Sequence, residues 1–220
     1  MLTRYLRFTV FTRLKQPFSD WARLRRMQQM LRTFNLRQGM CVLDLGGTTE
    51  IWSYSFIPSL NITIVNLPGT IEKSTGSQHD FQYVEGDGCN VEGIGDQSFD
   101  FVFSNSVIEH VGGPARRQAF ANEIRRIGKS YLVQTPSMWF PIEAHSGMPF
   151  WWFYPASLRR WLIERWRKKL PGWTEMVEAT TVLRRSELER LFPEAKVIVE
   201  RVLGIPKSYS AVNVPKTHAG

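Results

Sequence analysis

An acidic residue followed by two glycines, in the segment CVLDLGGTTE (41–50), has the residue types of a nucleoside-binding turn. The apolar residues before Asp44 are typical of a buried parallel strand, and Gly46 and Gly47 turn the backbone toward a helix. Such an arrangement places unpaired backbone N–H groups beside a crevice of nucleotide size. Alone it is a weak signal, because glycine after a strand often marks only a tight turn.

Three further segments end predicted strands with polar residues, in the order that a nucleoside-binding α/β domain requires. Asn66 ends the strand of NITIVNLPG (61–69) about 20 residues after the first turn, where dinucleotide-binding folds place a partner for a ribose hydroxyl. Asp87 follows a short strand, and its carboxylate can accept a hydrogen bond from an exocyclic amine such as that of adenine. Turn formation is the competing interpretation of both residues. Residues 104–106 (Ser-Asn-Ser) end the next strand, at the edge where open α/β sheets bind ligands.

The segments that follow carry the other chemically capable side chains. Residues 107–112 (VIEHVG) are predicted to begin a helix, with Glu109 and His110 near its start. Residues 130–145 are predicted to form a fifth strand, followed by an aromatic loop punctuated by proline.

Together these segments resemble the class I S-adenosylmethionine-dependent methyltransferases, over roughly residues 38–146. The motifs VLDLGG and FDFVFSNSVIEHV and the acid after the third strand carry the resemblance. The turn GGTTEIW, the strand end VNL and the loop TPSMWFPIEAH look most like methyltransferases of bacterial glycan and glycolipid biosynthesis. The resemblance implies a Rossmann-like three-layer α/β sandwich, with a mostly parallel seven-stranded sheet and an antiparallel last strand.

The resemblance also implies S-adenosylmethionine as cofactor and S-adenosylhomocysteine as product. Thr48 and Glu50 stand where the family carries its second and third glycines, and Asn66 replaces the usual acidic ribose ligand. The charge of Glu50 disfavours a pyrophosphate and is compatible with the α-ammonium group of S-adenosylmethionine. The residues that we expect to bind the cofactor are Asp44, Gly46, Gly47, Thr48, Asn66, Leu67, Asp87, Gly88, Asn105 and Ser106.

Methyl transfer to a hydroxyl requires an aligned acceptor and a group that removes the hydroxyl proton. Histidine suits this role near neutral pH, and the chain has four. We interpret His145 as the general base and Glu143, two residues before it, as the group that orients it. His110 is a further catalytic candidate, although a structural role in the strand-to-helix turn is the stronger interpretation. Packing of the loop is the competing interpretation of His145, and His79 and His218 lie in less suitable segments.

We therefore expect O-methylation of a small-molecule, sugar or glycolipid acceptor. One alternative is methylation at carbon or nitrogen of a quinone-like or other metabolite. Another is a catalytically silent protein of the same fold that binds a membrane or nucleic acid. Residues 104–107 (SNSV) stand where methyltransferases of base amines carry an Asn/Asp-Pro-Pro-aromatic motif, so nucleic acid is a disfavoured partner.

Basic residues are concentrated in two segments. Residues 1–40 contain nine basic residues and one acid, which accounts for the whole net charge of +8. Helical spacing of apolar residues in this segment predicts an amphipathic helix with Arg23, Arg25, Arg26 and Arg32 on its other face.

Residues 151–170 contain six basic residues and one acid, and Leu158, Trp161, Leu162 and Trp166 would form one apolar face. Pro155 suits the first turn of this predicted helix, and Pro171-Gly172 would end it. An aromatic face beside a basic face suits a helix lying on an anionic membrane. An amphipathic helix that caps the active site, with a solvated basic face, is the alternative.

The length of 220 residues favours one catalytic domain. We divide the chain into a basic helical segment (1–37), a methyltransferase domain (38–212) with a lid (about 137–175), and a tail (213–220). No apolar run long enough to span a membrane and no signal-type core are present, so the predicted location is the cytoplasm. Peripheral contact with the inner face of the membrane, through residues 1–37 and 151–170, is a further expectation.

The two cysteines, Cys41 and Cys89, lie in or next to predicted strands and are interpreted as buried apolar residues in a reducing compartment. No His/Cys/Asp cluster has the sequence spacing of a metal site, so no metal is expected.

Overall fold

The computed structural model describes residues 24–71, 73 and 77–214. Most of the predicted N-terminal basic segment, including Arg23, and nearly all of the predicted tail therefore lie outside the described residues. Seven strands form one sheet: β1 (Cys41–Leu45), β2 (Asn61–Asn66), β3 (Asp80–Glu85), β4 (Phe101–Asn105), β5 (Tyr131–Pro136), β6 (Lys196–Val202) and β7 (Ile205–Asn213).

The strand order in the sheet is β3-β2-β1-β4-β5-β7-β6. Strands β1 to β5 pair in parallel, whereas β7 pairs antiparallel with both β5 and β6. The predicted fold class is thus confirmed, including the antiparallel final strand. The carboxyl ends of β1, β2 and β4 meet at one edge, which brings Asp44, Asn66 and Asn105 to the same side of the sheet.

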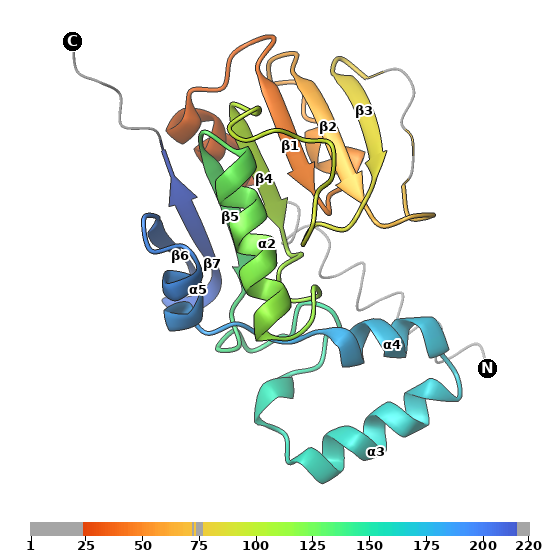
Figure 1. Ribbon diagram of the computed structural model, residues 1–220. Coiled ribbons are helices and arrows are strands. Elements are labelled where there is room, and N and C mark those ends of the chain that lie inside the picture. The colour runs from red at the N-terminus through yellow and green to blue at the C-terminus, as the bar shows by residue number, and fades with distance from the viewer. Residues whose placement is uncertain (1–23, 72, 74–76, 215–220) are drawn as a thin grey trace.

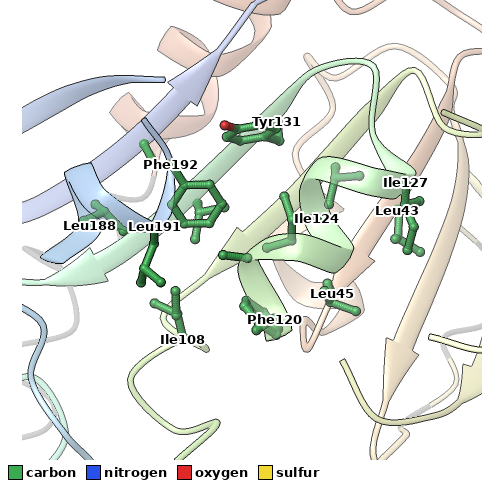
Figure 2. Packing of buried hydrophobic residues seen from close by; sticks show 14 of the residues in the cluster. Leu43, Leu45, Ile108, Phe120, Ile124, Ile127, Tyr131, Leu188, Leu191 and Phe192 are labelled. Atoms are coloured by element: carbon green, nitrogen blue, oxygen red, sulfur yellow. The ribbon is translucent and has the colours of Figure 1, made fainter. Parts of the chain in front are cut away.

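Each face of the sheet is covered by a separate apolar cluster, because successive side chains of a strand point to opposite faces. On one face, α2 (Pro114–Ile127) packs over Leu43 and Leu45 of β1, and α5 (Arg185–Leu191) packs beside α2 against β6 and β7 (Figure 2). On the other face, a helix over residues 24–34 buries side chains against β1, β2 and β4. The result is the expected three-layer sandwich.

The helix over residues 24–34 buries Met27, Met30 and Phe34, in agreement with its predicted apolar face. Arg26, however, was predicted on the opposite, basic face, and this expectation is wrong. Its guanidinium is mostly buried, donating to Asn105 Oδ1 at 2.5 Å and to Glu200 Oε2 at 2.9 Å. Arg26 therefore links the helix to the end of β4 and to β6.

The prediction of a helix from residue 107 is also wrong, since residues 108–110 form a turn and α2 begins only at Pro114. Ser106 has a left-handed φ of 59° and Gly112 a φ of 110°, so the backbone cannot continue a regular helix between them. Pro114 then provides a preset φ at the first helical position. Glu109 and His110 consequently lie in a turn at the edge of the sheet.

The basic helix predicted to begin at Pro155 is confirmed as α3 (Ala156–Arg167), and the residues before it form a 3₁₀ turn (η2, Trp151–Phe153). Proline and glycine at 171–172 do end α3, but they also begin another helix, α4 (Pro171–Ala179). In Figure 1 the two helices lie beyond the carboxyl ends of the parallel strands. No residue of α3 is fully buried, and Trp161 is 53% exposed.

Among the described residues, no helix is both long enough and apolar enough to cross a bilayer.

Candidate active site

A backbone hydrogen bond fixes the glycine turn after β1, and the turn has no space for a side chain at Gly47. Gly46 has a left-handed φ of 80°, and its N–H donates to the Val65 carbonyl at 2.8 Å. A Cβ at Gly47 would lie 2.0–2.1 Å from the carboxylate atoms of Asp44. The chain continues into a single 3₁₀ turn, η1 (Thr49–Trp52), in place of the α-helix that the sequence suggests.

Asp44 lies fully buried beneath this turn. Trp52 Nε1 donates to its Oδ2 at 2.8 Å, whereas Oδ1 has no hydrogen-bond partner in the part of the chain that the structure describes. Burial raises the pKa of Asp44 to about 7, although the Trp52 hydrogen bond opposes this shift. Trp52 had no predicted role, because only the fold brings its indole to the end of β1.

A pocket of about 270 Å³ opens beside the turn, at the carboxyl edge of the sheet. Four of the predicted cofactor residues do not line this pocket: Asp44, Gly47, Thr48 and Asn105. Asp44 and Gly47 support the turn instead. Thr48 is exposed, and Asn105 accepts a hydrogen bond from Arg26. Six of the predicted cofactor residues line the pocket: Gly46, Asn66, Leu67, Asp87, Gly88 and Ser106.

Asn66 and Asp87 reach the pocket already bonded to other parts of the chain. The Asn66 amide donates to the Gly47 carbonyl at 3.3 Å and accepts from the Leu67 N–H at 3.0 Å. The Asp87 carboxylate accepts from the Cys89 N–H and from Arg116, with Nη2 of Arg116 2.9 Å from each oxygen. These hydrogen bonds, led by the Cys89 N–H, hold the pKa of Asp87 below its usual range.

Arg116 lines the pocket together with Asp87 and was not predicted as a site residue. Arg116 and Asp87 are 29 residues apart in the sequence, and only the fold brings their side chains together.

A second group of polar residues adjoins the pocket through His110, which is one of its lining residues. His110 Nε2 lies 2.9 Å from His145 Nε2, and His145 Nδ1 lies 3.0 Å from Glu143 Oε1. Glu109 Oε1 lies 3.8 Å from His145 Nε2. The turn after β4 and the loop after β5 thus bring together all three predicted catalytic residues and Glu109, to which no catalytic role had been assigned.

Burial and hydrogen bonding shift the pKa values of His110, Glu143 and Glu109 in different directions. Burial lowers the pKa of His110 to about 4, so this ring is neutral at pH 7. Burial acts to raise the pKa of Glu143, but hydrogen bonds from His145 and Ser146 outweigh it and the pKa falls to about 2. Burial raises the pKa of Glu109 to about 7, although the charge of His145 and a hydrogen bond from Thr135 oppose the shift.

Two glycines in the wall of the pocket leave space for a ligand such as S-adenosylmethionine. A Cβ at Gly46 would lie 2.5 Å from Val107, and a Cβ at Gly88 would lie 2.8 Å from the Phe120 ring. Both positions therefore keep bare backbone at the pocket wall, where a ligand can approach closely.

Comparison with known proteins agrees with this geometry. Residues 46–131 match the family model described as a methyltransferase domain. No curated protein sequence shows significant similarity to the chain.

The fold is similar to those of several solved methyltransferase structures. A protein of Anabaena variabilis, described as a methyltransferase of an antibiotic biosynthesis pathway, is 17% identical with a TM-score of 0.51, over 80% of this chain and 64% of that one. A Haloferax volcanii protein solved with a methyltransferase activator is 13% identical with a TM-score of 0.53, over 93% and 97%. The present chain spans less than two thirds of the Anabaena protein.

A phosphoethanolamine N-methyltransferase of Haemonchus contortus, solved with phosphomonomethylethanolamine and S-adenosylhomocysteine, is 12% identical. Its TM-score is 0.52, over 86% of this chain and 52% of that one. At these identities the likeness shows the fold alone. Residues 46–131 match a methyltransferase domain, and the described chain has the fold of solved methyltransferases.

Proposed function

We propose that the protein transfers a methyl group to a hydroxyl oxygen of a sugar or glycolipid acceptor. The observation that carries this proposal is the chain of contacts from Glu143 through His145 to His110, which ends at the wall of the cofactor pocket. A histidine base beside this wall would suit a hydroxyl acceptor, whose proton must leave during transfer.

Glu143 determines which nitrogen of His145 is basic. Because the carboxylate is ionised at neutral pH, it accepts the Nδ1–H of His145 and leaves the lone pair on Nε2. When bound, S-adenosylmethionine supplies an electrophilic methyl group. The acceptor oxygen forms the new C–O bond as the S–C bond breaks with both electrons retained by sulfur, and His145 Nε2 takes the hydroxyl proton.

The proposed acceptor class is supported by a second pocket, of about 630 Å³, beside the loop that carries His145. Trp139 and Tyr209 contribute aromatic rings to it, and Arg184 and Ser186 contribute hydrogen-bond donors. An exposed indole beside polar groups is a suitable platform for a sugar ring, and Trp139 is 58% exposed.

We further propose peripheral membrane contact through α3, which would suit a lipid-linked acceptor. Leu158 and Trp161 are exposed on this helix, and neighbouring positions such as Arg160 and Arg165 are basic. Partition of an aromatic side chain into the interface and attraction to anionic lipids act together in such helices.

The O-methylation proposal is tested by comparing wild type with His145→Asn. We expect His145→Asn to keep its affinity for S-adenosylhomocysteine and to transfer methyl groups to hydroxyl acceptors roughly 10²- to 10⁴-fold more slowly. Calorimetry measures binding, and transfer is followed with radiolabelled S-adenosylmethionine across sugar, glycolipid and quinone-like acceptors. Unchanged transfer by His145→Asn, or transfer only to nitrogen or carbon, would contradict the proposal.

A further inference from the structure

Glu109, His110 and His145 present three potential metal-ligand atoms within 4.8 Å of one another. The atoms are Oε1 of Glu109 and Nε2 of both histidines. Glu109 and His110 are adjacent, but 35 residues separate His110 from His145, so the spacing typical of a metal motif is absent from the sequence.

The two imidazole nitrogens cannot both be unprotonated unless an ion lies between them. At a separation of 2.9 Å, two unprotonated Nε2 atoms would direct their lone pairs at each other. Either a shared proton or a metal ion can remove this repulsion. Two nitrogen ligands at about 2.0–2.1 Å from one ion lie roughly 3 Å apart, which is the separation seen here.

Glu109 distinguishes this cluster from an ordinary hydrogen-bonded histidine pair. Its side chain is fully buried, and Oε1 has no hydrogen-bond partner among the described residues. A buried carboxylate oxygen without a partner is energetically costly. Because this oxygen lies 3.8 Å from His145 Nε2, a small rotation would bring it into the coordination sphere of an ion held by the two histidines.

The groups behind these ligands are arranged as outer partners of a metal site. Glu143 Oε1 accepts from Nδ1 of His145, and Thr135 Oγ1 donates to Oε2 of Glu109 at 3.0 Å. Such bonds fix the ring orientation of a ligating histidine and leave its other nitrogen free for the ion.

We propose that Glu109, His110 and His145 bind a divalent transition-metal ion such as Zn²⁺ or Mn²⁺, whose open positions take the acceptor oxygen. Two imidazoles and one carboxylate favour such ions over Mg²⁺ or Ca²⁺, which prefer oxygen ligands. Three protein ligands leave room for a substrate or water.

The role given to the acceptor oxygen rests on the proposed function, whereas the ion site itself does not. A coordinated hydroxyl loses its proton more readily, so the proton would leave to solvent before transfer and His145 would act as a ligand. The coordinated oxygen would then form the C–O bond as the S–C bond breaks, with both electrons kept by sulfur.

The test begins with chelator-treated wild-type protein titrated calorimetrically with Zn²⁺, Mn²⁺ and Mg²⁺. We expect one Zn²⁺ or Mn²⁺ per chain at micromolar or lower concentration, and at least roughly tenfold weaker Mg²⁺ binding. We expect Glu109→Gln and His145→Ala to lose this binding and Glu143→Gln to weaken it by roughly 10- to 100-fold. Glu175→Gln, at an exposed position, is the control and should bind as wild type does.

Thermal unfolding and S-adenosylhomocysteine affinity show whether each variant is folded. If Glu109→Gln does not fold, the absorption spectrum of Co²⁺ bound to wild type still reports nitrogen ligation and low coordination number. Absence of a one-to-one site in wild type, or unchanged binding by the folded variants, would overturn the proposal.

Failure of the metal site and failure of the proposed function give different results. If metal-free protein still transfers methyl groups to hydroxyls and this transfer requires His145, the proposed function is supported and the metal site is contradicted. An ion bound through the three residues in a protein that methylates only nitrogen or carbon supports the site and contradicts O-methylation.

Discussion

Gly47 is the residue of the glycine turn for which a side chain has the least space. A Cβ there would overlap the buried carboxylate of Asp44, so Gly47→Ala must displace either the turn or the carboxylate. We expect this variant to bind S-adenosylhomocysteine at least roughly tenfold more weakly, a loss of about 1.4 kcal/mol or more. Calorimetry measures the affinity.

Gly95→Ala is the matched control, because a Cβ at Gly95 meets nothing within 4 Å. Equal affinities in the two variants would show that the Asp44 contact does not shape the cofactor pocket.

At the scale of single residues, the sequence predicts those that lie at strand ends and misses those recruited across the fold. Gly46, Asn66 and Asp87 were predicted from their position after apolar runs, and all three line the pocket. Trp52 and Arg116 act through contacts that no local pattern reveals. The ligating arrangement of Glu109 was equally hidden, because it depends on a loop 35 residues further along the chain.

At the scale of elements, one arginine connects the N-terminal helix to the sheet. Loss of Arg26 would leave Glu200, which also accepts from Ser208, without its guanidinium partner in a mostly buried place. We expect Arg26→Ala to lower the free energy of unfolding by about 1–3 kcal/mol. Urea denaturation measures this change.

Arg32→Ala removes the same charge from an exposed position of the same helix and should leave stability within about 0.5 kcal/mol of wild type. Similar losses in both variants would mean that the bonds of Arg26 to Asn105 and Glu200 contribute nothing specific.

The second prediction at this scale concerns the exposed face of α3. The double variant Leu158→Ser/Trp161→Ser loses exposed apolar area without a change of charge. Its binding to anionic vesicles should therefore weaken several-fold. Co-sedimentation with phosphatidylglycerol vesicles at low salt measures this effect. Failure of wild-type protein to sediment with them would exclude the proposed contact for the described part of the chain.

Elements with strong apolar periodicity were predictable, and those governed by backbone conformation were not. The five parallel strands follow apolar runs that end in polar residues, and the antiparallel last strand was expected from the family resemblance. The helix expected from residue 107 fails because Ser106 and Gly112 adopt left-handed φ values. The apolar face of α3 was predictable, but its exposure depends on where the helix lies in the fold.

At the scale of the whole molecule, Asp44 should make stability depend on pH. Burial raises its pKa from 3.8 to about 7, so the folded protein retains a proton that the unfolded chain releases between these values. This contribution is therefore most favourable below about pH 4 and is lost as the pH rises to about 7. The loss is on the order of 4 kcal/mol for the full shift.

Asp44→Asn isolates this effect, because the amide cannot titrate and its oxygen can still accept from Trp52 Nε1. Relative to wild type, this variant should become progressively more stable as the pH rises from 4 to 8, in urea denaturation with chelator present. Asp100→Asn should show no such slope over most of this range, because the hydrogen bond from Lys129 holds the pKa of Asp100 below its usual value and the group is already ionised in both the folded and the unfolded chain. Parallel curves for wild type and Asp44→Asn would mean that Asp44 is ionised in the folded protein, and that the turn then stabilises a buried negative charge.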